Sequence, residues 1–171
     1  LKAMGNEVVV TDRKKEEELS EAVAALAPGI ELALGGHSAE VFRDAGMVVL
    51  SPGVPGTLEP VRRAREQGAE VIGELELAWR LLYALPFYAV TGTNGKSTTA
   101  TLLNEMMLAD GRKTIFGGNI GNPLSGEIEA AGSGKLRLPE AQCVVVEVSS
   151  FQLESIDTFR PTGACVLNIT P

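Results

Sequence analysis

The chain has 171 residues, of which 44% are hydrophobic, and its formal net charge is −7 at pH 7. This length fits one domain or two small ones, and the hydrophobic share is sufficient for a packed core. No basic stripe is present to neutralise a nucleic-acid backbone, and the most apolar stretch is too short to cross a bilayer, so the sequence argues against nucleic-acid binding and membrane insertion.

The first half of the chain alternates short apolar strands with amphipathic helices. We expect strands at residues 8–10, 30–34, 47–50 and 70–72, and helices at 16–26, 39–44, 60–67 and 75–82. Such an alternation is typical of an α/β fold in which helices cover both faces of a parallel sheet.

The pattern restarts near Leu85 and Pro86, which predicts a domain boundary there and divides the chain into residues 1–84 and 85–171. The second part is expected to contain strands at 87–90, 114–116, 143–146 and 164–169, helices at 96–110 and 122–130, and a loop at 131–140. Four apolar residues of the helix at 96–110 are predicted to face the core, namely Leu102, Leu103, Met106 and Met107. Cys143 and Cys165 lie beside β-branched residues and are interpreted as buried thiols rather than a disulfide.

A glycine-rich turn containing a lysine lies between the strand at 87–90 and the helix that follows it. Its residues are Gly92, Thr93, Asn94, Gly95, Lys96, Ser97 and Thr98. Glycines allow backbone N–H groups to turn toward phosphate oxygens, and the helix adds the positive end of its dipole. Lys96 would then contact the β- and γ-phosphates, and the hydroxyl of Ser97 or Thr98 would bind Mg²⁺. The turn is two residues shorter than the common G-x-x-x-x-G-K-[ST] pattern, and the alternative is an ordinary helix start capped by Thr91 or Thr93.

Two polar residues follow other strands of the second part. Glu147 comes at the carboxyl end of the apolar strand at 143–146, where parallel sheets bind their ligands, and is a candidate Mg²⁺ ligand. The alternative is a glutamate that faces solvent at the end of a strand. Asn119 lies in the glycine-rich turn at 117–121, and its amide can both donate and accept, although a plain tight turn explains this segment equally well.

The first half offers weaker candidates. Asp12 ends a strand, at a place where an acid can bind a ribose hydroxyl, or it simply forms a turn. Gly53 belongs to the turn Ser51-Pro52-Gly53 after another strand, and the single histidine, His37, is interpreted as a surface residue.

Together these motifs resemble those of the Mur ligase family of peptidoglycan synthesis. Residues 88–98 are similar to the ATP loop of that family, which is shortened in the same way. Residues 117–121 and 147–154 are similar to motifs of the members that add D-glutamate. Residues 11–13, 51–53 and 72–76 fit the uridine-binding domain of the same members.

The resemblance implies a Rossmann-like N-terminal domain over 1–84 that binds the UDP-muramoyl substrate, followed over 85–171 by part of a P-loop ATPase α/β central domain. Within the central domain it implies that ATP binds at 92–98, that Lys96 and Glu147 are catalytic, and that Ser97 and Glu147 hold Mg²⁺. It also implies that four residues contact the UDP-muramoyl substrate, namely Asn119 and, around its uridine end, Asp12, Arg13 and Gly53.

The implied reaction is the ATP-dependent formation of an amide. The γ-phosphoryl group passes to the carboxylate of UDP-N-acetylmuramoyl-L-alanine, and the amine of D-glutamate attacks the resulting acyl phosphate. The resemblance further implies a cytoplasmic enzyme, which we expect to be monomeric. Compared with the family, the chain lacks a first strand and the segments after Pro171 that complete the metal and D-glutamate sites, so we expect it to be inactive by itself.

Three other readings of the sequence remain open. The first is another amide ligase, of the Mur type or the folylpolyglutamate type. The glycine-rich turn at 92–98, called the phosphate turn below after its predicted role, does not distinguish these ligases by itself, whereas residues 149–152 do. The second is a nucleotide-binding switch module without turnover. The third is a dinucleotide-binding domain without catalytic activity.

Overall fold

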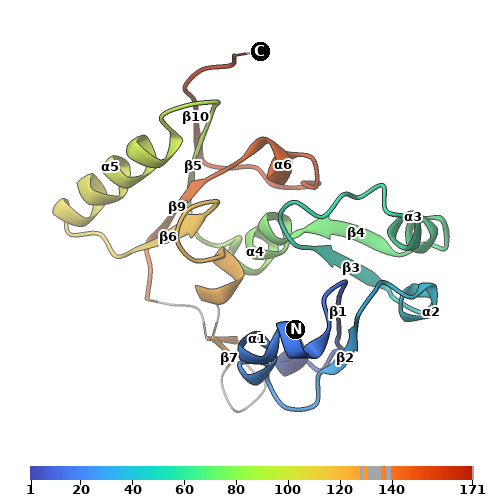
Figure 1. The fold of residues 1–171 in the computed structure, drawn as a ribbon. Coiled ribbons are helices and arrows are strands. Elements are labelled where there is room, and N and C mark those ends of the chain that lie inside the picture. The colour runs from blue at the N-terminus through green and yellow to red at the C-terminus, as the bar shows by residue number, and fades with distance from the viewer. Residues whose placement is uncertain (128, 131–135, 138–139, 171) are drawn as a thin grey trace. The chain divides into compact units, whose positions relative to one another are not determined.

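The computed structural model describes residues 1–127, 129–130, 136–137 and 140–170. The described chain forms two compact units (Figure 1). The first unit contains Leu1–Val48 and Pro55–Val71, and the second contains Val49–Val54, Ile72–Glu129 and residues 140–170. Each unit is described by itself.

The first unit is built around two parallel strands, β1 (Val9–Asp12) and β2 (Glu31–Leu34), which pair from Val9 opposite Glu31 to Asp12 opposite Leu34. Its helical segments are η1 (Lys2–Met4), η2 (Glu16–Glu18), α1 (Ser20–Ala24), α2 (Ala39–Phe42) and α3 (Glu59–Glu66). The strands β3 (Met47–Leu50) and β4 (Glu70–Gly73) pair with each other. The division between the two units falls within each of these strands, after Val48 and after Val71.

The helix predicted over 16–26 is shorter and interrupted in the structure, where the 3₁₀ turn η2 precedes a five-residue α1. None of the residues of either segment is buried. Short helices depend on tertiary packing for their stability, and this segment has little of it, so the periodic pattern of apolar residues does not produce a long helix here.

The second unit contains a four-stranded parallel sheet in the order β10-β5-β9-β6. Its strands are β5 (Phe87–Thr91), β6 (Thr114–Gly118), β9 (Cys143–Glu147) and β10 (Gly163–Val166). Its helical segments are α4 (Glu74–Leu82), α5 (Lys96–Ala109), η3 (Leu124–Glu127) and α6 (Ser150–Leu153). The parallel strands alternating with helices confirm the predicted α/β fold class.

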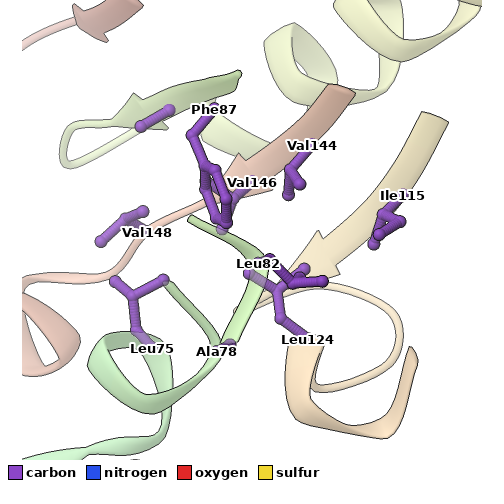
Figure 2. Packing of buried hydrophobic residues seen from close by; sticks show 10 residues of the cluster. Leu75, Ala78, Leu82, Phe87, Ile115, Leu124, Val144, Val146 and Val148 are labelled. Carbon is purple, nitrogen blue, oxygen red and sulfur yellow. The ribbon is translucent and has the colours of Figure 1, made fainter. Parts of the chain in front are cut away.

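The core of the second unit lies between this sheet and α4. Leu75, Ala78 and Leu82 of α4 pack against Phe87 of β5 and Val146 of β9, together with Leu124 of η3 (Figure 2). All of these side chains are buried. The domain boundary between residues 84 and 85 stays a prediction, and α4, which precedes it, contributes to the core of the second unit.

The other face of the sheet carries α5, and here two predictions are wrong. Leu102 and Met106 are 59% and 61% exposed, while Ala100 and Asn104 are the buried residues of the helix. Cys165 of β10 is exposed, whereas Cys143 of β9 is buried as predicted. Leu102, Met106 and Cys165 border an apolar groove of about 350 Å³ between α5 and the strands β5 and β10. Leu103 and Met107 are half-buried, so the covered stripe of the helix overlaps the predicted one only in part.

The segment between η3 and β9 is described only in part. Two-residue strands, β7 (Glu129–Ala130) and β8 (Leu136–Arg137), pair with each other. The rest of the loop predicted at 131–140 lies outside the described residues, apart from Glu140. Among the described residues no helix is long and apolar enough to cross a membrane.

Candidate functional site

The glycine-rich turn connects the carboxyl end of β5 to the start of α5, as the sequence predicts. Its last glycine, Gly95, is the N-cap residue of α5 and has a left-handed backbone with φ of 83°. A glycine has no side chain to cap the helix, and no side-chain cap is formed there. The alternative of a helix start capped by Thr91 or Thr93 is therefore not realised. The first turn of α5 presents its backbone N–H groups without a side-chain acceptor, which favours the binding of an anion.

The lysine of the turn folds back over the loop. The Nζ of Lys96 donates a hydrogen bond to the backbone carbonyl of Thr93 at 3.1 Å, and the side chain is half-buried. The following Ser97 and Thr98 are exposed in the first turn of α5. The ammonium group and two hydroxyl groups thus lie together at the amino end of this helix.

Glu147 ends β9, the strand next to β5 in the sheet. Val90 pairs with Glu147 in the parallel register, so the turn that begins at Gly92 lies just beyond the strand position opposite the glutamate. The carboxylate and the phosphate turn are therefore at the same edge of one sheet. Glu147 is only 2% exposed, which rules out the alternative of a glutamate facing solvent.

The Glu147 carboxylate has a partner on one oxygen only. Its Oε1 accepts a hydrogen bond of 2.7 Å from the side-chain amide of Asn119, whereas Oε2 is buried without a hydrogen-bond partner in the part of the chain that the structure describes. The backbone N–H of Asn119 also donates to the carbonyl of Glu147 at 2.9 Å. Asn119 and Glu147, which were predicted separately from two motifs, are thus joined by two hydrogen bonds.

The glycine before Asn119 permits this close approach. A Cβ at Gly118 would lie 2.4 Å from the carbonyl oxygen of Glu147 and 2.6 Å from a methyl carbon of Val146. The end of β6 can reach β9 only without a side chain at this position. A glycine at position 118 is therefore required by the packing around Glu147.

The segment after Glu147 has a structural role that the sequence reading did not anticipate. Ser149 is the N-cap of α6, and its hydroxyl accepts a hydrogen bond from the backbone N–H of Gln152. The side chain of Gln152 in turn accepts from the N–H of Ser149 at 3.0 Å, which completes a capping box.

The residues predicted around the uridine are divided between the two units. Asp12 and Arg13 belong to the first unit, where Asp12 is half-buried and its carboxylate accepts from the backbone N–H of Lys14 at 2.8 Å. His37, interpreted as a surface residue, is half-buried, and its Nδ1 lies 3.0 Å from the hydroxyl of Thr11. Gly53 lies in an exposed turn of the second unit with φ of 83°.

Mg²⁺ would have hard oxygen ligands at this sheet edge. The unpartnered Oε2 of Glu147 is a carboxylate oxygen, and the Ser97 hydroxyl is a second oxygen donor, so the chemistry of both fits the ion. The described residues contain no group of three or more His, Cys, Asp or Glu side chains that could hold a metal by themselves.

One residue at this sheet edge was not predicted from the sequence. Asn168, which follows β10, contacts the phosphate turn through its side chain and its backbone. The predicted strand at 164–169 placed it inside a strand, whereas β10 ends at Val166. The sequence offers no signal for this contact beyond a polar residue near the end of the predicted strand at 164–169, because the sequence does not show that β10 lies next to β5.

Comparison with known families gives two matches along the chain. Residues 1–73 match the family model described as Mur ligase MurD-like, N-terminal domain. Residues 90–171 match the model described as Mur ligase middle domain. Together the two models account for nearly the whole chain.

Similar curated proteins carry one common name. The UDP-N-acetylmuramoylalanine–D-glutamate ligase of Anaeromyxobacter dehalogenans is 50% identical over 167 residues, which are 98% of this chain and 34% of that protein. The protein of the same name from Geotalea uraniireducens is 50% identical over 171 residues, 99% of this chain and 36% of its own length. The chain thus spans about a third of the length of the curated relatives it matches.

Solved structures support the fold. The UDP-N-acetylmuramate:L-alanyl-gamma-D-glutamyl-meso-diaminopimelate ligase of Neisseria meningitides is 24% identical, with a TM-score of 0.60 over 97% of this chain and 54% of that one. The UDP-N-acetylmuramate-alanine ligase MurC of Thermotoga maritima is 23% identical, with a TM-score of 0.52 over 96% of this chain and 36% of that one.

Proposed function

This chain belongs to the Mur ligase family, and we propose that it is part of an ATP-dependent ligase that adds D-glutamate to UDP-N-acetylmuramoyl-L-alanine in the synthesis of peptidoglycan precursors. The relatives that are about 50% identical over almost the whole chain carry the name of this activity. The observation that carries the proposal is the common sheet edge of the phosphate turn and Glu147, where Val90 pairs with Glu147.

The proposed roles follow from charge and position. ATP binds at residues 92–98, where the ammonium of Lys96 offsets the charge of the phosphates and the start of α5 supplies N–H donors. Ser97 and Glu147 would hold Mg²⁺, which when bound supplies positive charge that neutralises the phosphates and aligns their oxygens. These groups act by positioning and electrostatics, since two anions, the triphosphate and the substrate carboxylate, must approach each other.

The reaction we propose has two steps. The γ-phosphoryl group moves from ATP to the alanine carboxylate of the substrate, which releases ADP. The amine of D-glutamate then attacks the acyl phosphate, forms the amide and releases phosphate. Lys96 holds positive charge beside the transferred group in the first step, because its ammonium lies at the phosphate turn.

We also propose that Asp12, Arg13 and Gly53 contact the uridine end of the UDP-muramoyl substrate and that Asn119 contacts the same substrate. Asp12, Gly53 and Asn119 lie at or just after strand ends, where parallel α/β sheets bind ligands, and Arg13 follows Asp12 directly. We further propose that the reaction takes place in the cytoplasm. The monomeric state stays a prediction.

The test is a substrate panel on the full-length protein. ADP release and the mass of the product are measured with ATP, UDP-N-acetylmuramoyl-L-alanine and each of D-glutamate, L-alanine, L-lysine, meso-diaminopimelate and L-glutamate. We expect turnover with D-glutamate and at least about a hundredfold loss of kcat/KM in Lys96→Ala, because a charge beside the transferred group is removed. Lys113→Ala is the matched control, since Lys113 is exposed and its ammonium pairs with the exposed Glu140 at 2.7 Å. Equal turnover with the other amino acids, or product without ATP, contradicts the proposal.

A further inference from the structure

The phosphate turn is held by the chain segment that follows β10. The backbone N–H of Leu167 donates to the carbonyl of Thr91 at 3.0 Å, which continues the pairing of β10 with β5 past the end of the strand. The next residue, Asn168, then lies against the turn itself. A Cβ at Gly92 would be 3.1 Å from both the N and the O of Asn168, so the two backbones touch where the turn begins.

The side chain of Asn168 pairs with the backbone of one residue of the turn. Its Oδ1 accepts from the N–H of Asn94 at 2.9 Å, and its Nδ2 donates to the carbonyl of Asn94 at 2.9 Å. The backbone carbonyl of Asn168 accepts from the N–H of Thr93 at 3.0 Å as well. Asn168 is exposed, but both groups of its carboxamide bond to the same residue, and this fixes its orientation without burial.

These contacts decide which N–H groups are open to a ligand. The N–H groups of Thr93 and Asn94 are both engaged by Asn168. The donors that remain for an anion begin at Gly95, the N-cap of α5, and continue into the first turn of the helix, beside the ammonium of Lys96. The shortened turn therefore offers an anion the N–H donors at the start of the helix, while the N–H groups of its own first half bond to Asn168.

We propose that Asn168 is a positioning residue for ATP, which sets the conformation of the short phosphate turn by pairing with Asn94 and so keeps the donors at the start of α5 in place. That the ligand is ATP rests on the proposed function. The effect of Asn168 on the conformation of the turn does not. A longer phosphate turn encloses the phosphate with its own residues. In this chain the turn is two residues shorter, and the carboxamide of Asn168 holds it from outside.

Two variants of the full-length protein test the role. Asn168→Ala removes both side-chain hydrogen bonds. Asn168→Asp keeps the shape and the acceptor for the Asn94 N–H but loses the donor, and it serves if the alanine variant does not fold. Asn6→Ala is the matched control, because Asn6 is exposed and its amide donates a hydrogen bond to the nearby carbonyl of Leu1 at 3.1 Å.

The first readout is hydrogen exchange of the amides of Thr93 and Asn94 in nucleotide-free protein, and it needs no ligase activity. We expect exchange to be faster in Asn168→Ala and unchanged in Asn6→Ala. The second readout is the KM for ATP, which should rise about tenfold, the factor equivalent to about 1.4 kcal/mol, while the KM values for the UDP substrate and D-glutamate stay unchanged.

The outcomes separate this inference from the proposed function. Wild-type exchange and a wild-type KM for ATP in both Asn168 variants overturn the positioning role and leave the ligase function intact. A rise of all three KM values by the same factor, together with a loss of thermal stability, also overturns it, because this is the result of a general structural defect. If the wild-type protein has no D-glutamate ligase activity, the proposed function fails, and the exchange rates still decide whether Asn168 holds the turn.

Discussion

At the scale of single residues, the pair Asn119 and Glu147 sets the electrostatics of the site. A buried anionic oxygen without a hydrogen-bond donor is unfavourable, and the Oε2 of Glu147 is such an atom. The amide of Asn119 engages the other oxygen at 2.7 Å and so determines which oxygen is left open. A cation at this oxygen would relieve the imbalance, which makes Asn119 an outer partner of the proposed Mg²⁺ ligand.

We predict that Asn119→Ala in the full-length protein weakens binding of a divalent cation by about 10- to 100-fold, the usual effect of removing the partner of a metal ligand. The measurement is a titration with Mn²⁺ in the presence of ATP, followed by electron paramagnetic resonance. The UDP substrate is left out, because Asn119 is also proposed to contact it. Glu147→Gln keeps the shape of the side chain but removes its charge, and it should weaken binding further. An unchanged Mn²⁺ affinity in both variants would contradict the metal role of this pair.

At the scale of secondary-structure elements, the strand–turn–helix unit from β5 to α5 could be predicted to within one residue at its ends, because its apolar strand and glycine-rich turn are local signals. The position of Glu147 at a strand end could be predicted for the same reason. The hydrogen-bond partners of these segments could not be predicted. The Asn119–Glu147 and Asn94–Asn168 bonds join residues 28 and 74 positions apart, and only the order of the strands brings them together.

The exposed side of α5 shows a second limit of the sequence pattern. The spacing of apolar residues identifies a stripe on a helix, but it does not determine which of two neighbouring stripes the sheet covers. The side-chain oxygen of the buried Asn104 accepts a hydrogen bond from the hydroxyl of Thr114 at 2.6 Å, and Ala100 and Asn104 are buried where Leu102 and Met106 are exposed.

A buried carboxylate joins α4 to the loop that precedes β10. Glu76 is fully buried, and its oxygens accept from the backbone N–H groups of Asp157, Thr158 and Phe159 and from the guanidinium of Arg80. Burial by itself would raise the pKa of Glu76, but the hydrogen bonds from the Thr158 hydroxyl, the Asp157 N–H and Arg80 outweigh it and lower the pKa to about 2. Residues 72–76 resembled part of the uridine-binding domain, yet Glu76 is bound within the second unit.

The lowered pKa predicts how this contact responds to acid. The folded pKa lies below the unfolded value of about 4.3, so the stabilisation is complete at neutral pH and is lost as the pH falls from about 4 to about 2. Glu76→Gln should destabilise the protein by about 2–3 kcal/mol at pH 7, because an uncharged amide presents its own N–H group to three N–H donors. The difference from wild type should become smaller toward pH 2.

Urea unfolding and amide exchange at Asp157, Thr158 and Phe159 measure this effect in the full-length protein at pH 7 and pH 3. Glu105→Gln is the matched control, since Glu105 lies exposed on α5, where the loss of a surface charge has little effect on stability. A difference between wild type and Glu76→Gln that is equally large at both pH values would show that the charge of Glu76 is not what stabilises the loop.

At the scale of the whole molecule, the described residues contain part of the proposed reaction centre. The chain brings a phosphate turn and a carboxylate to one sheet edge, and its relatives are about three times as long, since the chain spans 34% of one of them and 36% of another. An amide ligase must align three reactants, and most of its rate enhancement comes from holding them in one geometry. Nucleotide binding and catalysis should therefore separate when the 171 residues are studied alone.

We predict that the isolated 171-residue chain binds ATP but forms no amide, whereas the full-length protein does both. Binding is measured by equilibrium dialysis with labelled ATP, and amide formation by the mass of the product after incubation with UDP-N-acetylmuramoyl-L-alanine and D-glutamate. Circular dichroism first confirms that the isolated chain is folded, and Lys96→Ala in the same chain controls for binding elsewhere, because it removes the ammonium at the phosphate turn. An amide product that depends on D-glutamate would mean that the 171 residues contain the complete centre. Equal ATP binding by the chain and its Lys96→Ala variant would instead place the nucleotide away from the turn, and the case for the phosphate site would fail with it.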